Sequence, residues 1–243
     1  MNEQKDSLGD RMKGQYEDRT RYLLPRRTFT IIRLDGKAFH TLTRGCNKPF
    51  AEDVKEAMTA AAVAVVTEAQ GAKLAYIQSD EISLVLTDFD FITTQAWFDG
   101  NLQKIVSVAA GIASVAFSRV FGRNGIFDAR AFTIPDPVEV ENYFIWRQKD
   151  AIRNSVSACA QAAFSPKQLH GKKVADILPM LDEIGAPWDW TPIHYQRGWA
   201  ITRQERPDAP VERWSWAPDY EVPVFTEDRE YVRGRITIQE QTT

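Results

Sequence analysis

The chain has 243 residues, 44% of them hydrophobic and 26% charged, so it can bury a full core, which excludes disordered and collagen-like proteins. Its formal net charge of −3 argues against a general polyanion-coating protein, and any nucleic-acid partner must be bound through a local basic patch. Cys46 and Cys159 lie far apart without a CxxC or a nearby His pair, so neither a disulfide framework nor a zinc site is expected. The N-terminus is polar, and the longest apolar run, at 60–66, is far below the roughly 20 residues of a membrane span. We therefore expect a soluble, cytoplasmic protein.

The N-terminal third predicts a helix, a strand and a second helix. Residues 6–22 carry interspersed charges, which fits a solvated helix whose arginines are either surface charge or an RNA-facing edge. Residues 28–34 are β-branched and apolar and run into Asp35-Gly36, which predicts a buried strand ending in a tight turn. Residues 51–70 place apolar side chains at helical spacing.

A hairpin with an acidic tip follows. Two short apolar stretches, 73–77 and 82–86, are separated by Gln78-Ser79-Asp80-Glu81. A helix over 94–117 and a strand over 126–134 come next, so the order is β-α-β-β-α-β. This order predicts an α+β fold of the ferredoxin-like or polymerase-palm type, in which the third strand lies antiparallel beside the first. Asp35 and Asp80 should then be neighbours.

The C-terminal part predicts a long helix and two further strands. The helix begins at Asp136-Pro137, and its residues Arg147, Asp150 and Asn154 share one face. Candidate strands lie at 195–202 and 231–238. We expect a catalytic domain over 1–137 and an elaboration over 138–243 that packs on it as one globular unit.

Two aspartates at one end of a sheet predict phosphoryl-transfer chemistry, because Mg²⁺ prefers hard oxygen ligands and leaves room for substrate phosphates. Gly36 would let the backbone approach the metal and phosphates. The turn formed by Lys37, Ala38, Phe39 and His40 offers backbone N–H groups and two side-chain donors to a triphosphate. Lys48 and Arg130 are candidate phosphate clamps.

Each of these signals has an ordinary alternative. Asp-Gly after a strand and Ser-Asp-Glu at a hairpin tip are most often plain solvated turns, and their value here comes from their placement. The three histidines are scattered, so a histidine metal site is not expected. The sequence contains no P-loop, dinucleotide-binding fingerprint or GxSxG elbow.

Five segments together resemble the tRNA(His) guanylyltransferase family: IIRLDGKAFHTLTRG, KPF, YIQSDEISLVL, FDARAF and NYFIWRQKDAIRNS. The resemblance spans roughly residues 5–200 and is strongest to the bacterial and archaeal guanylyltransferase-like proteins, which add nucleotides in the 3′-to-5′ direction and repair tRNAs truncated at the 5′ end. It implies a polymerase-like palm, two Mg²⁺ ions, GTP or another NTP and ATP as substrates, tRNA as partner, and a homotetramer.

Carried onto this chain, the resemblance assigns the metals to Asp35, the Gly36 carbonyl and Asp80, with Glu81 completing the catalytic acidic tip. The nucleotide-binding set it implies is Asp35, Gly36, Lys37, Ala38, Phe39, His40, Lys48, Ser79, Asp80 and Arg130. Candidate RNA-binding residues, from charge and helix position, are Arg19, Arg27, Arg147, Lys149, Arg153 and Asn154, together with Arg21 and Arg26.

The chain departs from the eukaryotic enzymes at one informative position. Those enzymes carry a His-Ile-Asn-Asn run after the Trp-Arg-Gln segment, whereas here Ile152 stands at the His position. KPF also replaces the commoner Lys-Pro-Asn, and RGWAI replaces Arg-Gly-Thr. These departures favour 5′-end repair over dedicated G addition to tRNA(His).

Two rival functions stay open: a palm-type nucleotidyl cyclase using the same two aspartates, and a non-catalytic RNA-binding module.

Overall fold

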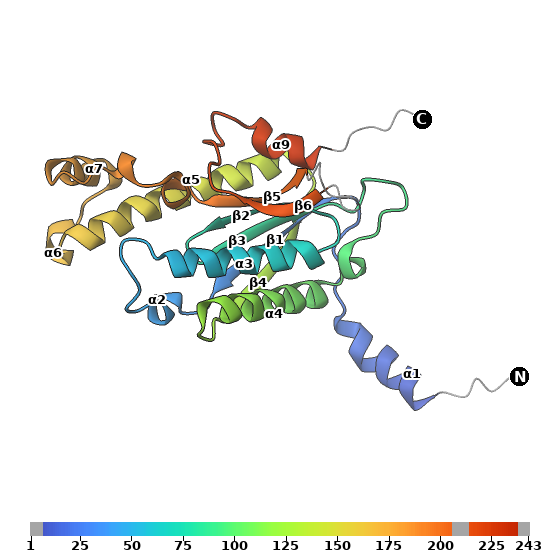
Figure 1. The fold of residues 1–243 in the computed structure, drawn as a ribbon. Helices are drawn as coiled ribbons and strands as arrows, with labels where there is room; N and C mark the ends of the chain where they lie inside the picture. The colour runs from blue at the N-terminus through green and yellow to red at the C-terminus, as the bar shows by residue number, and fades with distance from the viewer. Residues whose placement is uncertain (1–6, 206–213, 238–243) are drawn as a thin grey trace, which may run out of the picture.

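A computed structural model describes residues 7–205 and 214–237 (Figure 1). Its centre is a six-stranded sheet with the order β4-β1-β3-β2-β5-β6, in which every pairing of neighbours is antiparallel. The strands are β1 (Phe29–Gly36), β2 (Ala72–Gln78), β3 (Glu81–Leu86), β4 (Phe127–Ile134), β5 (Trp199–Glu205) and β6 (Trp214–Asp219). The expected antiparallel pairing of the first and third strands is confirmed.

One face of the sheet is covered by α3 (Glu52–Glu68) and α4 (Leu102–Phe121), which Figure 1 shows side by side. Alternate residues of the strands point to this face because side chains in a strand have a period of two. Ile32, Leu34 and Ile82 are fully buried here, against Met58 of α3 and Phe117 of α4. This layer is the larger core.

The opposite face is covered by α5 (Pro137–Ala163) and α9 (Glu230–Ile236). Asp136 caps α5 by accepting a hydrogen bond from the Val138 N–H, with Pro137 at the first helical position. The far end of α5 forms a small separate core with the short elements that follow it. Those elements are α6 (Pro166–Leu169), α7 (Val174–Glu183), the 3₁₀ turn η4 (Trp188–Trp190) and α8 (Ile193–Arg197).

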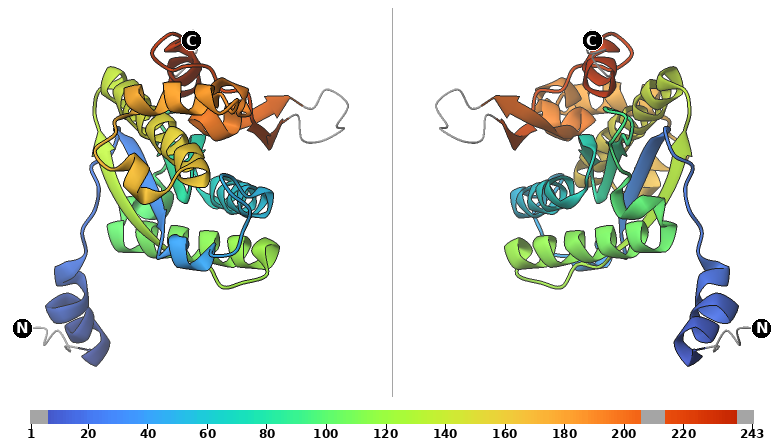
Figure 2. Two further views of the ribbon diagram at one scale, coloured as in Figure 1. Left: turned by 90° about the vertical axis from the view of Figure 1, so that its left-hand side faces the viewer. Right: turned by 90° about the vertical axis from the view of Figure 1, so that its right-hand side faces the viewer.

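The N-terminal segment stands away from this body (Figures 1 and 2). It consists of α1 (Leu8–Met12), the π-helical turn η1 (Lys13–Glu17) and the 3₁₀ turn η2 (Asp18–Thr20). Its root is fixed beside the turn η3 (Trp97–Gly100), because the Leu24 N–H donates to the Gly100 carbonyl and the Leu102 N–H donates to the Tyr22 carbonyl.

The C-terminal part differs from the prediction in two places. Residues 231–236 lie in α9 instead of a strand, and the helix α8 occupies the first half of the strand expected at 195–202. The strand β6, which was not predicted, pairs with β5. Because β5 pairs with β2, the two C-terminal strands β5 and β6 extend the same sheet that β1 to β4 form.

Candidate active site

The end of β1 and the turn between β2 and β3 bring two aspartates together. In the register of the sheet, Asp35 lies opposite Glu81, and the Gly36 N–H donates to the Asp80 carbonyl over 3.0 Å. Burial raises the pKa of the Asp80 carboxyl, and the negative charge of Asp35 raises it further. The predicted neighbourhood of Asp35 and Asp80 is therefore present, and the two carboxylates repel each other.

The turn after β1 is held by aromatic packing. A Cβ at Gly36 would lie 2.4 Å from the Phe39 ring, so only glycine fits at this position. Phe39 is 4% exposed and packs tilted against Phe117 and edge-on against Phe127, which makes it mainly a core residue. Ala38 adopts a left-handed conformation, with φ of 55°, and begins the short helix α2 (Phe39–Leu42).

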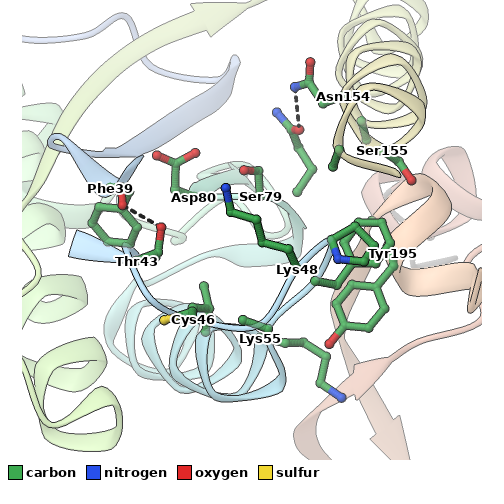
Figure 3. Close-up of a pocket in the computed structure, with 18 of the residues that line it drawn as sticks. Phe39, Thr43, Cys46, Lys48, Lys55, Ser79, Asp80, Asn154, Ser155 and Tyr195 are labelled. Atoms are coloured by element: carbon green, nitrogen blue, oxygen red, sulfur yellow. Dashed lines mark hydrogen bonds between the residues drawn. The ribbon is translucent and has the colours of Figure 1, made fainter. Parts of the chain in front are cut away.

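A cavity of about 390 Å³ opens beside Asp80 (Figure 3). Four parts of the chain line it: the loop and helix start at 39–55, the turn at 78–80, α5 and the α8–β5 junction. Figure 3 shows the Lys48 side chain reaching toward Ser79 and Asp80. Of the predicted nucleotide-binding residues, Phe39, His40, Lys48, Ser79 and Asp80 line this cavity.

Other predicted residues lie outside the cavity lining. The adjoining acidic turn contains four of them, Asp35, Gly36, Lys37 and Ala38. The side chains of Lys37 and Ala38 face solvent. Arg130 is half-exposed on β4, 3.7 Å from Asp128, which lies opposite Asp35 in the sheet. The structure thus separates Lys48, inside the cavity, from Arg130, on the far side of Asp35.

The other end of the cavity is aromatic, and sequence reasoning missed it. Phe50 and Tyr195 stack with ring centroids 4.5 Å apart, and the Tyr195 hydroxyl donates to Glu52 over 2.8 Å. Burial and this contact with Glu52 raise the pKa of Tyr195, while burial lowers the pKa of the adjacent His194. Because Phe50 and Tyr195 come from separate parts of the chain, no local pattern could have paired them.

The side chains of Glu81 and Arg147 pair with each other, which the sequence did not predict. Arg147 donates to both carboxylate oxygens of Glu81, over 2.7 and 2.8 Å, and both residues are buried. Arg147 therefore cannot meet RNA phosphates in this arrangement. The Glu81 carboxylate is thus held by an arginine, and the catalytic role expected for Glu81 stays a prediction. The prediction that Arg147 binds RNA was wrong, because i, i+3 and i+4 spacing defines a helix face without saying whether that face is buried.

The remaining RNA candidates are at the surface. Lys149 and Arg153 are exposed on α5, where Arg153 pairs with Asp150, and Asn154 hydrogen-bonds Gln78 over 3.5 Å and lines the cavity. Arg19, Arg21 and Arg27 are exposed near the N-terminus. Arg26 is engaged by Asp88 and by the Thr94 carbonyl, so it fastens the chain to the body.

The acidic turn offers only part of the ligand set of a metal ion, so substrate phosphates and water would have to complete it. Within residues 7–205 and 214–237, no group of three or more His, Cys, Asp or Glu side chains is arranged to hold a metal by itself. Mg²⁺ is commonly held by one or two carboxylates together with waters and substrate phosphates. Asp35, Asp80 and the Gly36 carbonyl fit that donor set, and a cation would relieve the repulsion that raises the pKa of Asp80.

The cavity and the acidic pair together suit a nucleoside triphosphate. The volume of the cavity is in the range of small-molecule sites. The cationic side chain of Lys48 lies beside Asp80 at one end, and the stacked rings of Phe50 and Tyr195 lie at the other. Phosphates would lie near Lys48 and the metal ligands, and the base would lie toward Phe50. This arrangement supports transfer at a phosphorus atom, because the carboxylates adjoin the charged end of the cavity.

Comparison with known proteins gives the family. A family model described as tRNA(His) guanylyltransferase matches residues 9–135, more than half of the chain. A solved structure described as a bacterial tRNA(His) guanylyltransferase-like protein in complex with ATP is 42% identical, with a TM-score of 0.88, covering 96% of this chain and 100% of that one. A similar bacterial protein in complex with GTP is 40% identical, with a TM-score of 0.80 and coverage of 94% and 98%.

More distant relatives include curated eukaryotic proteins. A probable tRNA(His) guanylyltransferase of Drosophila melanogaster is 28% identical over 72% of this chain and 66% of its own length. The tRNA(His) guanylyltransferase of Schizosaccharomyces pombe is 31% identical over 58% of this chain, which spans 56% of that enzyme. The chain thus spans somewhat more than half the length of these curated enzymes. With the family model covering the acidic turns and the strands that carry them, the chain belongs to the tRNA(His) guanylyltransferase family and is a nucleotidyltransferase.

Proposed function

We propose that this enzyme adds nucleotides to the 5′ end of tRNA in the 3′-to-5′ direction, using Mg²⁺ bound by Asp35, the Gly36 carbonyl and Asp80 on a polymerase-like palm. The observation that carries the proposal is the pair of adjacent carboxylates at the mouth of a nucleotide-sized cavity. ATP and GTP in complexes of the two bacterial relatives support nucleoside triphosphates as substrates here.

The reaction has two stages. The 5′-monophosphate of the tRNA first attacks the α-phosphorus of ATP and releases pyrophosphate, which leaves an adenylylated end. The 3′-hydroxyl of an incoming NTP then attacks the tRNA phosphorus and releases AMP. A tRNA that already bears a 5′-triphosphate needs only the second stage, which then releases pyrophosphate.

The protein's share of this chemistry is to bind and orient. Bound Mg²⁺ supplies charge neutralisation at the reacting phosphates and lowers the pKa of the attacking hydroxyl. Lys48 holds phosphate oxygens as a point charge, and His40 and Ser79 offer further donors at the same end. The Glu81–Arg147 ion pair fixes the start of β3, directly after the Asp80 turn, against α5.

We further propose repair of 5′-truncated tRNAs as the physiological activity. Base choice then comes from pairing to the opposite tRNA strand, so the protein needs to hold helix shape and phosphates only. Ile152 supports this proposal, because an aliphatic side chain at that position offers no hydrogen bond to a tRNA(His) feature. A homotetramer in the cytoplasm is the assembly and location that we propose from the resemblance to the family.

The test is one incubation with three RNA conditions. Labelled NTPs and Mg²⁺ are combined with a 5′-truncated tRNA, with intact tRNA(His), or with no RNA, and the products are sequenced or separated. We expect templated 5′ extension of the truncated tRNA and no extension by the Asp35→Asn protein. A cyclic nucleotide formed without RNA would establish the cyclase instead, and binding without product would establish a non-catalytic module. Extension of tRNA(His) alone would overturn the repair proposal.

A further inference from the structure

Trp146 of α5 is an exposed aromatic side chain whose orientation is fixed by its neighbours. The residue is 48% exposed. The guanidinium of Arg147 lies over the indole, 4.4 Å from the ring centroid, and Tyr143 packs edge-on against it with ring centroids 5.9 Å apart. Tyr143 packs in turn against Phe132 of β4. The indole is therefore held in place on the flank of α5 nearest β4, while a large part of its surface stays open.

The contacts of Trp146 lead directly to the acidic turn. Arg147, which covers one side of the indole, donates to both carboxylate oxygens of Glu81. Glu81 directly follows Asp80 and lies opposite Asp35 in the sheet. One arginine side chain thus joins the exposed indole to the strand end that carries the two aspartates.

Strand β4 continues this surface from the acidic turn toward the indole. Asp128 lies opposite Asp35, and Arg130 and Phe132 follow it at alternate positions, so the side chains of all three β4 residues share one face. Phe132 packs on Tyr143, which identifies that face as the one covered by α5. The Arg130 side chain is 54% exposed. A cationic side chain open to solvent therefore lies between the acidic turn and the aromatic side chains.

Helix α5 separates this surface from the nucleotide cavity. The residues of α5 that line the cavity are Ala151, Asn154, Ser155 and Ala158. Trp146 and Arg153, about two helical turns apart, share a different flank of the helix. The proposed reaction joins two molecules at one pair of aspartates. Because a nucleotide in the cavity approaches that pair from one flank of α5, the other flank is left for the end of the RNA.

We propose that the indole of Trp146 stacks on the terminal base pair at the 5′ end of the RNA helix and so holds the 5′-phosphate beside Asp35. The inference rests on the proposed function, because it gives the second substrate of that reaction a binding site. Proteins recognise RNA ends by stacking bases on aromatic side chains. Every base has a π-face, so stacking tolerates different sequences, which suits the repair of many tRNAs. Arg130 and Arg153 add exposed positive charge for the neighbouring phosphates.

The test pairs two substitutions at Trp146 with two RNAs. Trp146→Leu removes the ring, and Trp146→Phe keeps a smaller one. Trp214→Leu is the matched control, because Trp214 is 50% exposed and lies on β6, at the opposite edge of the sheet from β4. One RNA is a 5′-phosphorylated hairpin that copies the acceptor stem and T arm of a tRNA. The other is identical except that both nucleotides of its terminal pair lack their bases.

Affinity for each hairpin, measured without NTP, reports the stack. Trp146→Leu should weaken binding of the intact hairpin roughly five- to a hundred-fold, the range for loss of one base–aromatic stack, and Trp146→Phe should weaken it less. The parent and Trp146→Leu should bind the base-free hairpin equally, since the ring then has no base to contact. Trp214→Leu should match the parent with both RNAs. The KM for NTP should not change in any variant, because neither tryptophan lines the cavity.

Three results would overturn the inference, and they separate it from the proposed function. Parent affinity of Trp146→Leu for the intact hairpin would remove the indole from the RNA site, even where the parent protein extends tRNA. An equal loss with both hairpins, or a changed mass in light scattering, would assign Trp146 to the fold or to a contact between copies. No binding of either hairpin by the parent would contradict both proposals. Melting temperatures check the fold, and Trp146→Phe carries the comparison if Trp146→Leu unfolds.

Discussion

Arg147 of α5 donates hydrogen bonds to both carboxylate oxygens of Glu81 on β3, although the two residues are 66 positions apart in the chain. The pair is almost fully enclosed, and Ser83 continues the polar contact by bonding the Tyr143 hydroxyl over 2.8 Å. Asp80 directly precedes Glu81, so the ion pair fixes the turn on which the proposed metal site depends. The two neighbouring carboxylates of the Asp-Glu sequence thus differ in surroundings, because Asp80 lines the cavity and Glu81 belongs to a buried ion pair.

Loss of this arginine should destabilise the protein before it affects RNA binding. Arg147→Met leaves the buried Glu81 carboxylate without its partner, and removing one member of a buried pair costs about 3 to 5 kcal/mol. Lys149→Met, at an exposed position of the same helix, should change the free energy of unfolding by no more than about 0.5 kcal/mol. Urea denaturation measures both. Weakened tRNA binding by Arg147→Met with unchanged stability would return Arg147 to the RNA surface.

Asp80→Asn should stabilise the metal-free protein at neutral pH while abolishing nucleotide addition. The raised pKa means that the folded state holds the Asp80 proton more tightly than the unfolded state does, so the unfolding free energy falls as pH rises from about 4 through the folded pKa. The cost is complete once the pH exceeds the folded pKa, and an amide removes it.

The melting temperature, followed against pH and Mg²⁺, measures that cost. The advantage of Asp80→Asn should disappear below the unfolded pKa, and Mg²⁺ should stabilise the parent protein more than the variant. Asp128→Asn, at an exposed carboxylate opposite Asp35, serves as the control for a general charge effect. Equal stabilisation of all three proteins by Mg²⁺ would separate the metal from Asp80.

Lys48 and Arg130 should differ in kinetic effect, although the sequence assigned them one role. Lys48 lines the cavity beside Ser79, whereas Arg130 lies on β4 outside it. Loss of a charge-assisted contact costs about 1.5 to 3 kcal/mol, so Lys48→Ala should raise the KM for NTP roughly ten-fold or more, and Arg130→Ala should raise it less. Titration of NTP at saturating tRNA distinguishes them. A larger effect of Arg130→Ala would place the triphosphate across the β4 side.

The sequence predicted the parts of the site that are contiguous with a strand end. Asp35 and Asp80 follow from two buried strands and the antiparallel pairing of the first with the third, because apolar patterning fixes both the strands and their order. The aromatic end of the cavity was not predictable, since Phe50 meets Tyr195 only through tertiary packing. Residues 231–236 of the strand expected at 231–238 belong to α9, and residue 238 lies outside the described residues. The apolar Val232 and Ile236 are four apart and face α5, a spacing that short runs share with strands.

The stack of Phe50 on Tyr195 should govern access to the base end of the cavity. Phe50→Ala removes the ring and should raise the KM for NTP several-fold, whereas Tyr195→Phe keeps the stack and loses only the hydrogen bond to Glu52, worth about 1 kcal/mol. The comparison uses KM for ATP and for GTP with each variant. An equal rise for both variants would show that the hydroxyl, instead of the ring, is the important group.

Binding of tRNA should depend on the exposed basic residues and should be nearly indifferent to tRNA identity. Lys149 and Arg153 face solvent on α5, and Arg19 and Arg27 are exposed near the N-terminus. Each phosphate that such a residue neutralises lowers the slope of log affinity against log salt by slightly less than one. The Lys149→Ala, Arg153→Ala double variant should therefore flatten the slope by between one and two units relative to the parent. Arg26→Ala, which removes a side chain already engaged by Asp88, should leave the slope unchanged.

Filter binding over a salt series with tRNA(His) and an unrelated tRNA measures the slope and the preference between the two tRNAs. A parent slope near zero, or a preference for tRNA(His) that survives in the double variant, would contradict a phosphate-based surface on α5.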